Sequence, residues 1–191
     1  TFSNLIVQNN VSTYDGGGLM VHSSSASLSG LIVRNNHSIE YSSGGGLTFA
    51  DSQILIDDII VENNTSTHYG GGLALNNNQL VDITNSSIGN NFAGNSGGGL
   101  YIETSEINFS NLNIINNSSG LTGGGIYLNN STINASNLNI SNNSADQEGG
   151  DTDYGQGLGG GVFASSSDLN IDNCSINSNY ANQRGGGLYV V

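Results

Sequence analysis

A run of three glycines recurs seven times along this chain at a nearly constant spacing, and this repeat limits what the chain can fold into. The runs begin at Gly16, Gly44, Gly70, Gly97, Gly123, Gly159 and Gly185, so the steps are 28, 26, 27, 26, 36 and 26 residues. An asparagine keeps the same period at Asn10, Asn36, Asn64, Asn91, Asn117, Asn143 and Asn179. Self-similarity at a fixed period of roughly 20–50 residues is typical of solenoids, in which each repeat packs on its neighbours.

Aligning the repeats on these landmarks shows columns of similar residues. Each glycine run is followed by an alternating segment such as Leu100-Tyr101-Ile102, which predicts a strand with its first and third residues buried. A small polar column comes next: Ser24, Ser52, Asn78, Ser105, Ser131 and Ser167. An apolar column follows it: Phe2, Leu28, Ile56, Ile83, Phe109, Ala135 and Ile171. A third predicted strand buries pairs such as Leu112 and Ile114.

These columns predict an all-β fold, a right-handed single-stranded parallel β-helix of about seven coils of 26–28 residues with three short strands per coil. Stacked coils enclose a core that one coil cannot form alone. We expect residues 1–191 to be a single segment of a longer array, and residues 145–158 to be a loop insertion that accounts for the one 36-residue step. The recurring asparagines are expected to face inward and to form a ladder of stacked amides.

One segment shows a resemblance to a known family. Ile88-Gly89-Asn90-Asn91-Phe92-Ala93, followed by Gly97-Gly98-Gly99-Leu100, resembles the repeat of polymorphic outer-membrane proteins, which are pectin-lyase-like right-handed parallel β-helices. The residues from Ile176 to Leu188 are similar to the same repeat. The resemblance implies a surface-exposed passenger domain that is often involved in adhesion.

Composition excludes several classes of partner. The chain has 2 basic and 15 acidic residues, giving a net charge of −13. Nucleic-acid backbones and anionic membrane surfaces attract basic proteins, so neither is an expected partner. The sequence contains no apolar stretch long enough to predict membrane insertion. Cys174, the single cysteine, aligns with Leu31, Ile59 and Leu138 and is interpreted as a small core residue, with a reactive thiol as the alternative.

Fourteen Asn-x-Ser/Thr sequons occur in the chain. Asn108, Asn134 and Asn139 are predicted to point outward and are the preferred N-glycan sites, with Asn130, Asn85 and Asn173 at turns next. Four sequons begin at ladder residues and are expected to stay unmodified: Asn10, Asn36, Asn64 and Asn117. The remaining sequons begin at Asn63, Asn116, Asn129 and Asn142. An Asn- and Ser-rich chain also generates sequons by chance.

Two further features could form contact sites. The outward column Tyr101, Tyr127, Phe163 and Tyr189 could bind carbohydrate or a neighbouring subunit, or could simply stabilise the sheet by stacking. The insertion carries four carboxylates that could hold Ca²⁺ or form a solvated acidic loop: Asp146, Glu148, Asp151 and Asp153. No other cofactor is indicated.

The predicted function is a non-enzymatic extracellular structural or adhesive protein that bears N-glycans and extends by end-to-end stacking of coils with itself. A polysaccharide-binding or polysaccharide-degrading β-helix is the first alternative, and an ice-binding protein is the second. Catalysis is disfavoured because Arg34 and Arg184 lie about five coils apart and because His22, His37 and His68 show no evident carboxylate or nucleophile partner in the sequence.

Overall fold

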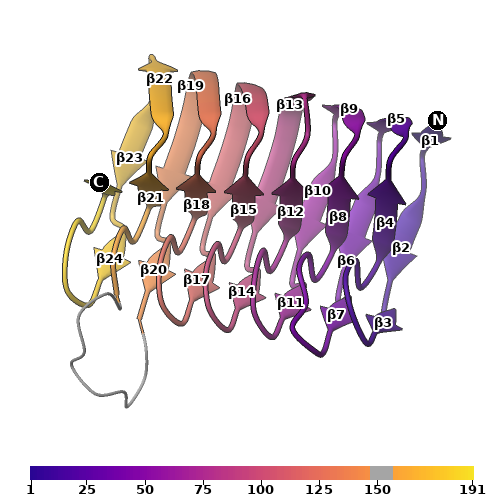
Figure 1. Ribbon diagram of the computed structural model, residues 1–191, viewed down its shortest axis with the longest axis horizontal. Helices are drawn as coiled ribbons and strands as arrows, with labels where there is room; N and C mark the ends of the chain where they lie inside the picture. Colours follow the sequence, from indigo (N-terminus) through magenta and orange to yellow (C-terminus); the bar gives the residue numbers. More distant parts are fainter. Residues whose placement is uncertain (147–156) are drawn as a thin grey trace.

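The computed structural model describes residues 1–146 and 157–191 and contains strands and turns, with no helix among these residues. All strand pairs are parallel and join each coil to the next. Seven coils stack along one axis, and the two termini lie at opposite ends of the stack (Figure 1). The predicted parallel β-solenoid is therefore confirmed.

The coils form three sheets that share the solenoid axis. Sheet A has eleven strands: β1 (Phe2–Ser3), β2 (Ile6–Gln8), β5 (Ser25–Ser29), β6 (Ile32–Arg34), β9 (Gln53–Asp57), β10 (Ile60–Glu62), β13 (Leu80–Gly89), β16 (Glu106–Ile115), β19 (Thr132–Ser141), β22 (Asp168–Asp172) and β23 (Ser175–Asn177).

Sheets B and C have seven strands each, one from every coil. Sheet B contains β3 (Val11–Ser12), β7 (His37–Ser38), β11 (Thr65–Ser66), β14 (Phe92–Ala93), β17 (Ser118–Ser119), β20 (Ser144–Ala145) and β24 (Tyr180–Ala181). Sheet C follows the glycine runs and contains β4 (Leu19–His22), β8 (Leu47–Ala50), β12 (Leu73–Asn76), β15 (Leu100–Glu103), β18 (Ile126–Asn129), β21 (Val162–Ser165) and β25 (Leu188–Val190).

The sheets divide each coil differently from the sequence prediction. Two of the three predicted strands belong to sheet A, and in the middle coils they merge into the ten-residue strands β13, β16 and β19. One residue with positive φ in each of these strands, such as Asn111 (φ 53°), bends the chain while the coils on either side remain paired. Sheet B is made of two-residue strands, which are too short to show alternation, so the sequence pattern predicted no strand there.

The core is a set of apolar columns in the predicted register. Ile83 pairs with Ile56 of the preceding coil and with Phe109 of the following coil. These side chains are 0–2% exposed, as expected for a continuous core between stacked coils. Cys174 packs against this core from a half-buried position in the last coil.

The triple glycines are explained by how closely the coils approach one another. Gly97 has φ of +68°, a conformation that side chains with a Cβ rarely adopt. A Cβ on Gly99 would lie 2.7 Å from the carbonyl oxygen of Gly125 and 2.9 Å from the Asn117 amide nitrogen. The third glycine therefore leaves room for the asparagine column, which ties the two sequence landmarks to one packing constraint.

The seven recurring asparagines form a buried amide ladder along the axis, as the sequence predicted. The Oδ1 of Asn91 accepts from the backbone N–H (2.9 Å) and Nδ2 (3.1 Å) of Asn64, and its own Nδ2 donates to Val61 O (3.0 Å) and Asn117 Oδ1 (3.0 Å). Because every polar group of the amide is satisfied, these hydrogen bonds offset the desolvation cost of a side chain that is only 1% exposed. The same bonds recur from Asn10 to Asn179.

We expect Asn91→Ala to lower the free energy of unfolding by about 3 kcal/mol, because it leaves the buried N–H and Nδ2 of Asn64 without their acceptor at about 1–3 kcal/mol each. Urea denaturation followed by circular dichroism measures this loss. The control is Asn90→Gly at the exposed neighbouring position, where φ is +56°, with an expected change within about 0.5 kcal/mol. Equal stability of Asn91→Ala and the unmodified chain would show that the ladder does not stabilise the fold.

Candidate functional site

A groove runs along the outer face of sheet A, parallel to the solenoid axis. One cavity of about 470 Å³ and another of about 450 Å³ share Asp82 and Thr84 in their walls, so they form one continuous depression. The wall nearer the start of the long strands contains Asp82, Asn108, Asn134 and Asn170, and the opposite wall contains Thr84, Ser110 and Ser136. We call this depression the sheet A groove. Its walls are hydroxyl, amide and carboxylate groups.

Amides in the first wall are hydrogen-bonded from coil to coil. Nδ2 of Asn108 donates to Asp82 Oδ1 (2.8 Å), Nδ2 of Asn134 donates to Asn108 Oδ1 (3.1 Å), and Nδ2 of Asn170 donates to Asn134 Oδ1 (2.9 Å). Each amide donates to the preceding coil, whereas the interior ladder donates to the following coil. This exterior ladder therefore ends on a carboxylate, the strongest acceptor that the chain offers.

A second exterior ladder follows the bend of sheet A and also ends on a carboxylate. Asn85 Nδ2 donates to Asp57 Oδ1 (2.8 Å), Asn111 Nδ2 donates to Asn85 Oδ1 (3.0 Å), and further bonds continue the ladder through Asn137 to Asn173. Thr84 Oγ1 also donates to Asp57 Oδ1 (2.7 Å). The bonds from Thr84 and then Asn85 lower the pKa of Asp57 below its usual 3.8, because both favour the ionised carboxylate.

Side-chain hydrogen bonds on the surface engage five of the six preferred glycan candidates. Asn108, Asn134, Asn85 and Asn173 belong to the two exterior ladders, and Asn139 Nδ2 donates to Asn113 Oδ1 (3.3 Å). Asn130 differs, since it is exposed, has φ of +47° and makes no side-chain hydrogen bond within residues 1–146 and 157–191. Glycan occupancy at all six remains a prediction.

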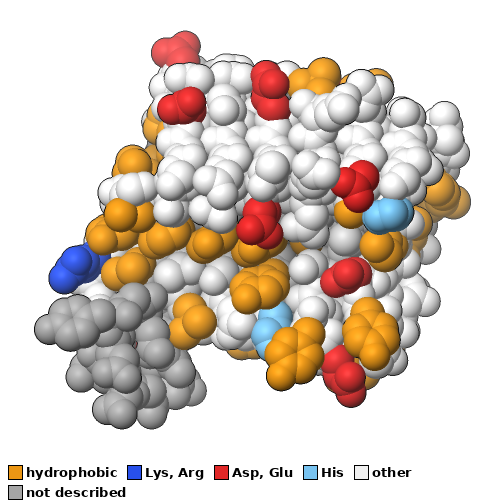
Figure 2. Space-filling view, in the orientation of Figure 1, with side chains coloured by type: hydrophobic (Ala, Val, Ile, Leu, Met, Phe, Trp, Pro, Cys, Tyr) orange, Lys and Arg blue, Asp and Glu red, His pale blue; other side chains and the backbone are white. Residues whose placement is uncertain are grey.

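The aromatic column is stacked, but it is more covered than the sequence suggested. Ring centroids are 4.9 Å apart for Tyr101–Tyr127, 5.2 Å for Tyr127–Phe163 and 5.7 Å for Phe163–Tyr189. Tyr101 is 8% and Phe163 9% exposed, because each ring lies between neighbouring rings, and Tyr69 packs on Tyr101 at 4.8 Å. Burial raises the pKa of Tyr101 and of Tyr127. A band of hydrophobic side chains follows the axis over the strands of sheet C (Figure 2). The stacking fits a column that stabilises the sheet, and its contact with carbohydrate or a neighbouring subunit stays a prediction.

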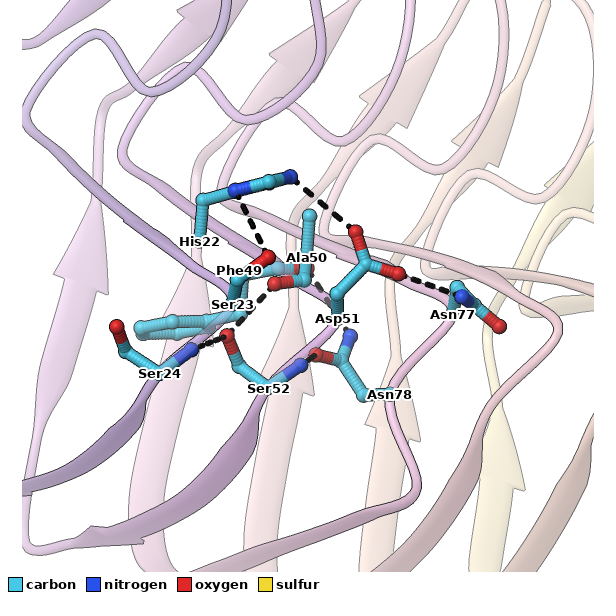
Figure 3. Close-up of polar contacts among 9 residues, drawn as sticks. All are labelled: His22, Ser23, Ser24, Phe49, Ala50, Asp51, Ser52, Asn77 and Asn78. Carbon is cyan, nitrogen blue, oxygen red and sulfur yellow. Dashed lines mark hydrogen bonds and ion pairs between the residues drawn. The ribbon is translucent and has the colours of Figure 1, made fainter.

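His22 contacts both a hydroxyl and a carboxylate, which the sequence prediction missed. Ser23 Oγ lies 3.1 Å from His22 Nδ1, and His22 Nε2 lies 3.2 Å from Asp51 Oδ2 (Figure 3). Asn77 Nδ2 donates to the other oxygen of Asp51. Below this chain of contacts, the small polar column Ser24–Ser52–Asn78 forms its own ladder, in which Ser52 N–H donates to Asn78 Oδ1 (3.0 Å).

A hydroxyl, an imidazole and a carboxylate in this order are the components of a nucleophile activated by a general base. The His22 and Asp51 side chains are 58% and 44% exposed, however, so water screens their interaction. We assign the cluster no catalytic role. His22 and Asp51 lie in successive coils, and Asp51 aligns with Ser23, the residue after His22. The aligned repeats could therefore have predicted that the two side chains lie close together.

The acidic insertion lies mostly outside the described residues. Asp146 is exposed, and its backbone N–H donates to Ser119 O (3.0 Å), whereas Glu148, Asp151 and Asp153 are not among the described residues. In the described part of the chain, no three His, Cys, Asp or Glu side chains come together in a group that could hold a metal ion. The calcium hypothesis for the insertion thus remains a prediction.

No protein-family model, curated protein or solved structure matches this chain. The resemblance to polymorphic outer-membrane proteins consequently has no family match to support it, and what the structure shows is the parallel β-solenoid. Among the described residues, no helix is long and apolar enough to cross a membrane.

We expect the Asp57 carboxyl to titrate below 3.8 and both Asn85→Ala and Thr84→Val to raise its pKa, because each removes one donor. A pKa that is depressed in the folded state contributes stability above pH 3.8, and this stability is lost as the pH falls through the folded-state value. Carboxyl-detected NMR titration measures the shift. Asn137→Ala, two positions further along the same ladder, is the control and should leave Asp57 unchanged. An Asp57 pKa that stays the same in Thr84→Val and Asn85→Ala would show that these two hydrogen bonds do not lower it.

Proposed function

We propose that this chain is a non-catalytic extracellular structural or adhesive repeat protein, whose solenoid extends by end-to-end stacking of coils and carries N-glycans. The observation that carries the proposal is the parallel pairing of every coil with the next in three continuous sheets, a geometry that extends by the addition of further coils. A strand edge with unpaired backbone groups is a template for another strand. In a solenoid the same edge also exposes the ends of every core column.

The end coils leave apolar side chains uncovered that are buried elsewhere. Leu188 is 40% and Val190 57% exposed, whereas their partners one coil earlier, Val162 and Ala164, are 2% and 0% exposed. At the other end Leu5 is 43% exposed. A further coil stacked on either end would bury this surface, at roughly 25 cal/mol for each Å² of apolar area.

Polar groups at the two ends complement each other in the register of the repeat. Asp15 precedes the first glycine run by one residue, as Arg184 precedes the last, so a first coil placed on a seventh coil brings the two residues into neighbouring positions of one column. Asp15 Oδ1 also accepts from the Ser43 backbone N–H (2.7 Å). Asn10 Oδ1 accepts no hydrogen bond from the described residues, and the Asn179 backbone N–H donates none to them. Stacking would continue the interior ladder from Asn179 to Asn10. A further coil with the same repeat pattern would satisfy these groups, and a second copy of this chain can supply one.

We expect Arg184→Asp to weaken self-association by placing two carboxylates at the junction, and the double variant Asp15→Arg/Arg184→Asp to restore part of it. Sedimentation velocity over a concentration series measures association, and electron microscopy shows whether rods lengthen along the axis. Glu106→Arg changes an exposed charge in a middle coil and serves as the control. A chain that remains a monomer of single-rod length at high concentration would overturn assembly from copies.

A polysaccharide-binding role is a second candidate, and the sheet A groove is the observation that favours it. From Asn108 onward its walls carry an amide in each coil, with hydroxyls at Ser110 and Ser136, and these groups can donate to and accept from the hydroxyls of a linear glycan. We expect Asn108→Ala/Asn134→Ala to weaken the retardation of the chain in gels containing neutral polysaccharides. Asn113→Ala, on the other half of sheet A, is the matched control. Retardation that is absent, or equal in all variants, would remove this candidate.

A further inference from the structure

A row of exposed residues lies at the corner before sheet B, one position before each interior ladder asparagine. All have positive φ, between 53° and 58°: Asn9, Asn35, Asn63, Asn90, Asn116, Asn142 and Ser178. All seven side chains are exposed, and none makes a hydrogen bond with another described residue. We call this row the corner column. It differs from the exterior ladders, whose amides are bonded to one another.

Three corner residues begin N-glycosylation sequons, namely Asn63-Asn64-Thr65, Asn116-Asn117-Ser118 and Asn142-Asn143-Ser144. The third residue of each sequon starts a strand of sheet B, and its side chain is half-buried rather than buried. A glycan at these asparagines would project from the corner into solvent. Bulky surface modification of this kind needs an amide that the fold does not use.

Two of these sequons overlap a second sequon that begins inside the fold. Asn64-Thr65-Ser66 and Asn117-Ser118-Ser119 start at ladder residues that are 0% and 1% exposed. Asn64 Nδ2 donates to Val33 O (2.9 Å) and Asn91 Oδ1 (3.1 Å), so both of its hydrogens are bonded. Asn117 Nδ2 is engaged in the same way by Ile88 O (2.9 Å) and Asn143 Oδ1 (3.1 Å). A glycan on either ladder residue is incompatible with the folded core.

Modification replaces one Nδ2 hydrogen by sugar. The nitrogen forms a bond to the anomeric carbon of a lipid pyrophosphate-linked oligosaccharide, a proton is lost from nitrogen, and the pyrophosphate leaves with the electron pair of the broken carbon–oxygen bond. Two such oligosaccharides on consecutive residues would compete for the same space. Modification of the first asparagine of an overlapping pair therefore hinders modification of the second.

We propose that Asn63, Asn116 and Asn142 are N-glycan acceptors of this chain alongside the exposed Asn130, and that glycans on Asn63 and Asn116 protect the ladder residues Asn64 and Asn117 from modification. This inference rests on the extracellular role proposed above. It moves the expected glycans from the exterior ladders to the corner column. The corner column thus has a role in folding as well as in surface chemistry.

The test separates each overlapping pair with one substitution. Thr65→Ala removes the sequon of Asn63 but keeps that of Asn64, whereas Thr65→Ser keeps both and is the matched control. Ser118→Ala and Ser118→Thr make the same distinction for Asn116 and Asn117. The full chain and these variants are produced in a eukaryotic secretory host. Glycosidase treatment in heavy-oxygen water then marks the occupied asparagines for peptide mass mapping.

In the folded, secreted fraction we expect occupancy at Asn63, Asn116 and Asn142 and none at Asn64 or Asn117. We expect Thr65→Ala and Ser118→Ala to lower the folded yield several-fold, with glycans on Asn64 or Asn117 in the misfolded fraction. In the bacterial cytoplasm, both variants should fold as well as the chain without substitutions. That result would show that the lower folded yield comes from glycosylation and not from the substitution.

A corner column left unmodified in the folded chain overturns the proposal, as does a folded chain with a glycan on Asn64 or Asn117. Unchanged secretion of Thr65→Ala and Ser118→Ala overturns the protective role. The self-association of unglycosylated chain from bacteria is measured separately. Failure of the glycan inference is therefore distinguishable from failure of the proposed assembly.

Discussion

The amide ladder inside the solenoid is the interaction on which the rest of this structure depends. A buried asparagine amide has two donors and an acceptor with two lone pairs. Here backbone groups satisfy one donor and one lone pair, and the other donor and lone pair are satisfied by asparagines at the same place in the neighbouring coils. That requirement sets the register between coils. It also calls for a residue without a side chain opposite the amide, as at Gly99 beside Asn117. Length between landmarks can vary, as in the 36-residue step, because only the landmarks must align.

Most of the fold could be predicted from the sequence because the repeat shows each constraint seven times. The columns through Ile56, Ile83 and Phe109 aligned in sequence as they pair in space. The division into sheets could not be predicted as well. Strands of two residues leave no periodicity, and a single left-handed residue such as Asn111 can bend a strand while its coils remain paired.

The surface was harder to predict than the core. Alternation in the sequence predicts whether a side chain points inward or outward, but it does not predict which surface side chains bond to one another. Alternation placed Asn108 and Asn134 outside, yet it gave no indication that their amides bond to one another and end on Asp82. The pair of His22 and Asp51 was overlooked because they lie 29 positions apart in sequence and one coil apart in space. The corner asparagines were not among the preferred glycan sites, because each directly precedes an interior ladder asparagine in the sequence. The sequence did not indicate that the first residue of each pair is exposed while the second is part of the ladder.

The interior and exterior ladders donate in opposite directions along the axis. Each amide carries a dipole, and the side-chain dipoles inside the solenoid therefore point toward the last coil while those outside point toward the first. A stack with only one ladder would add a dipole of the same sign with every coil, as an α-helix does with every peptide unit. Here the two sets oppose each other, so in the coils that carry both ladders the side-chain dipoles partly cancel.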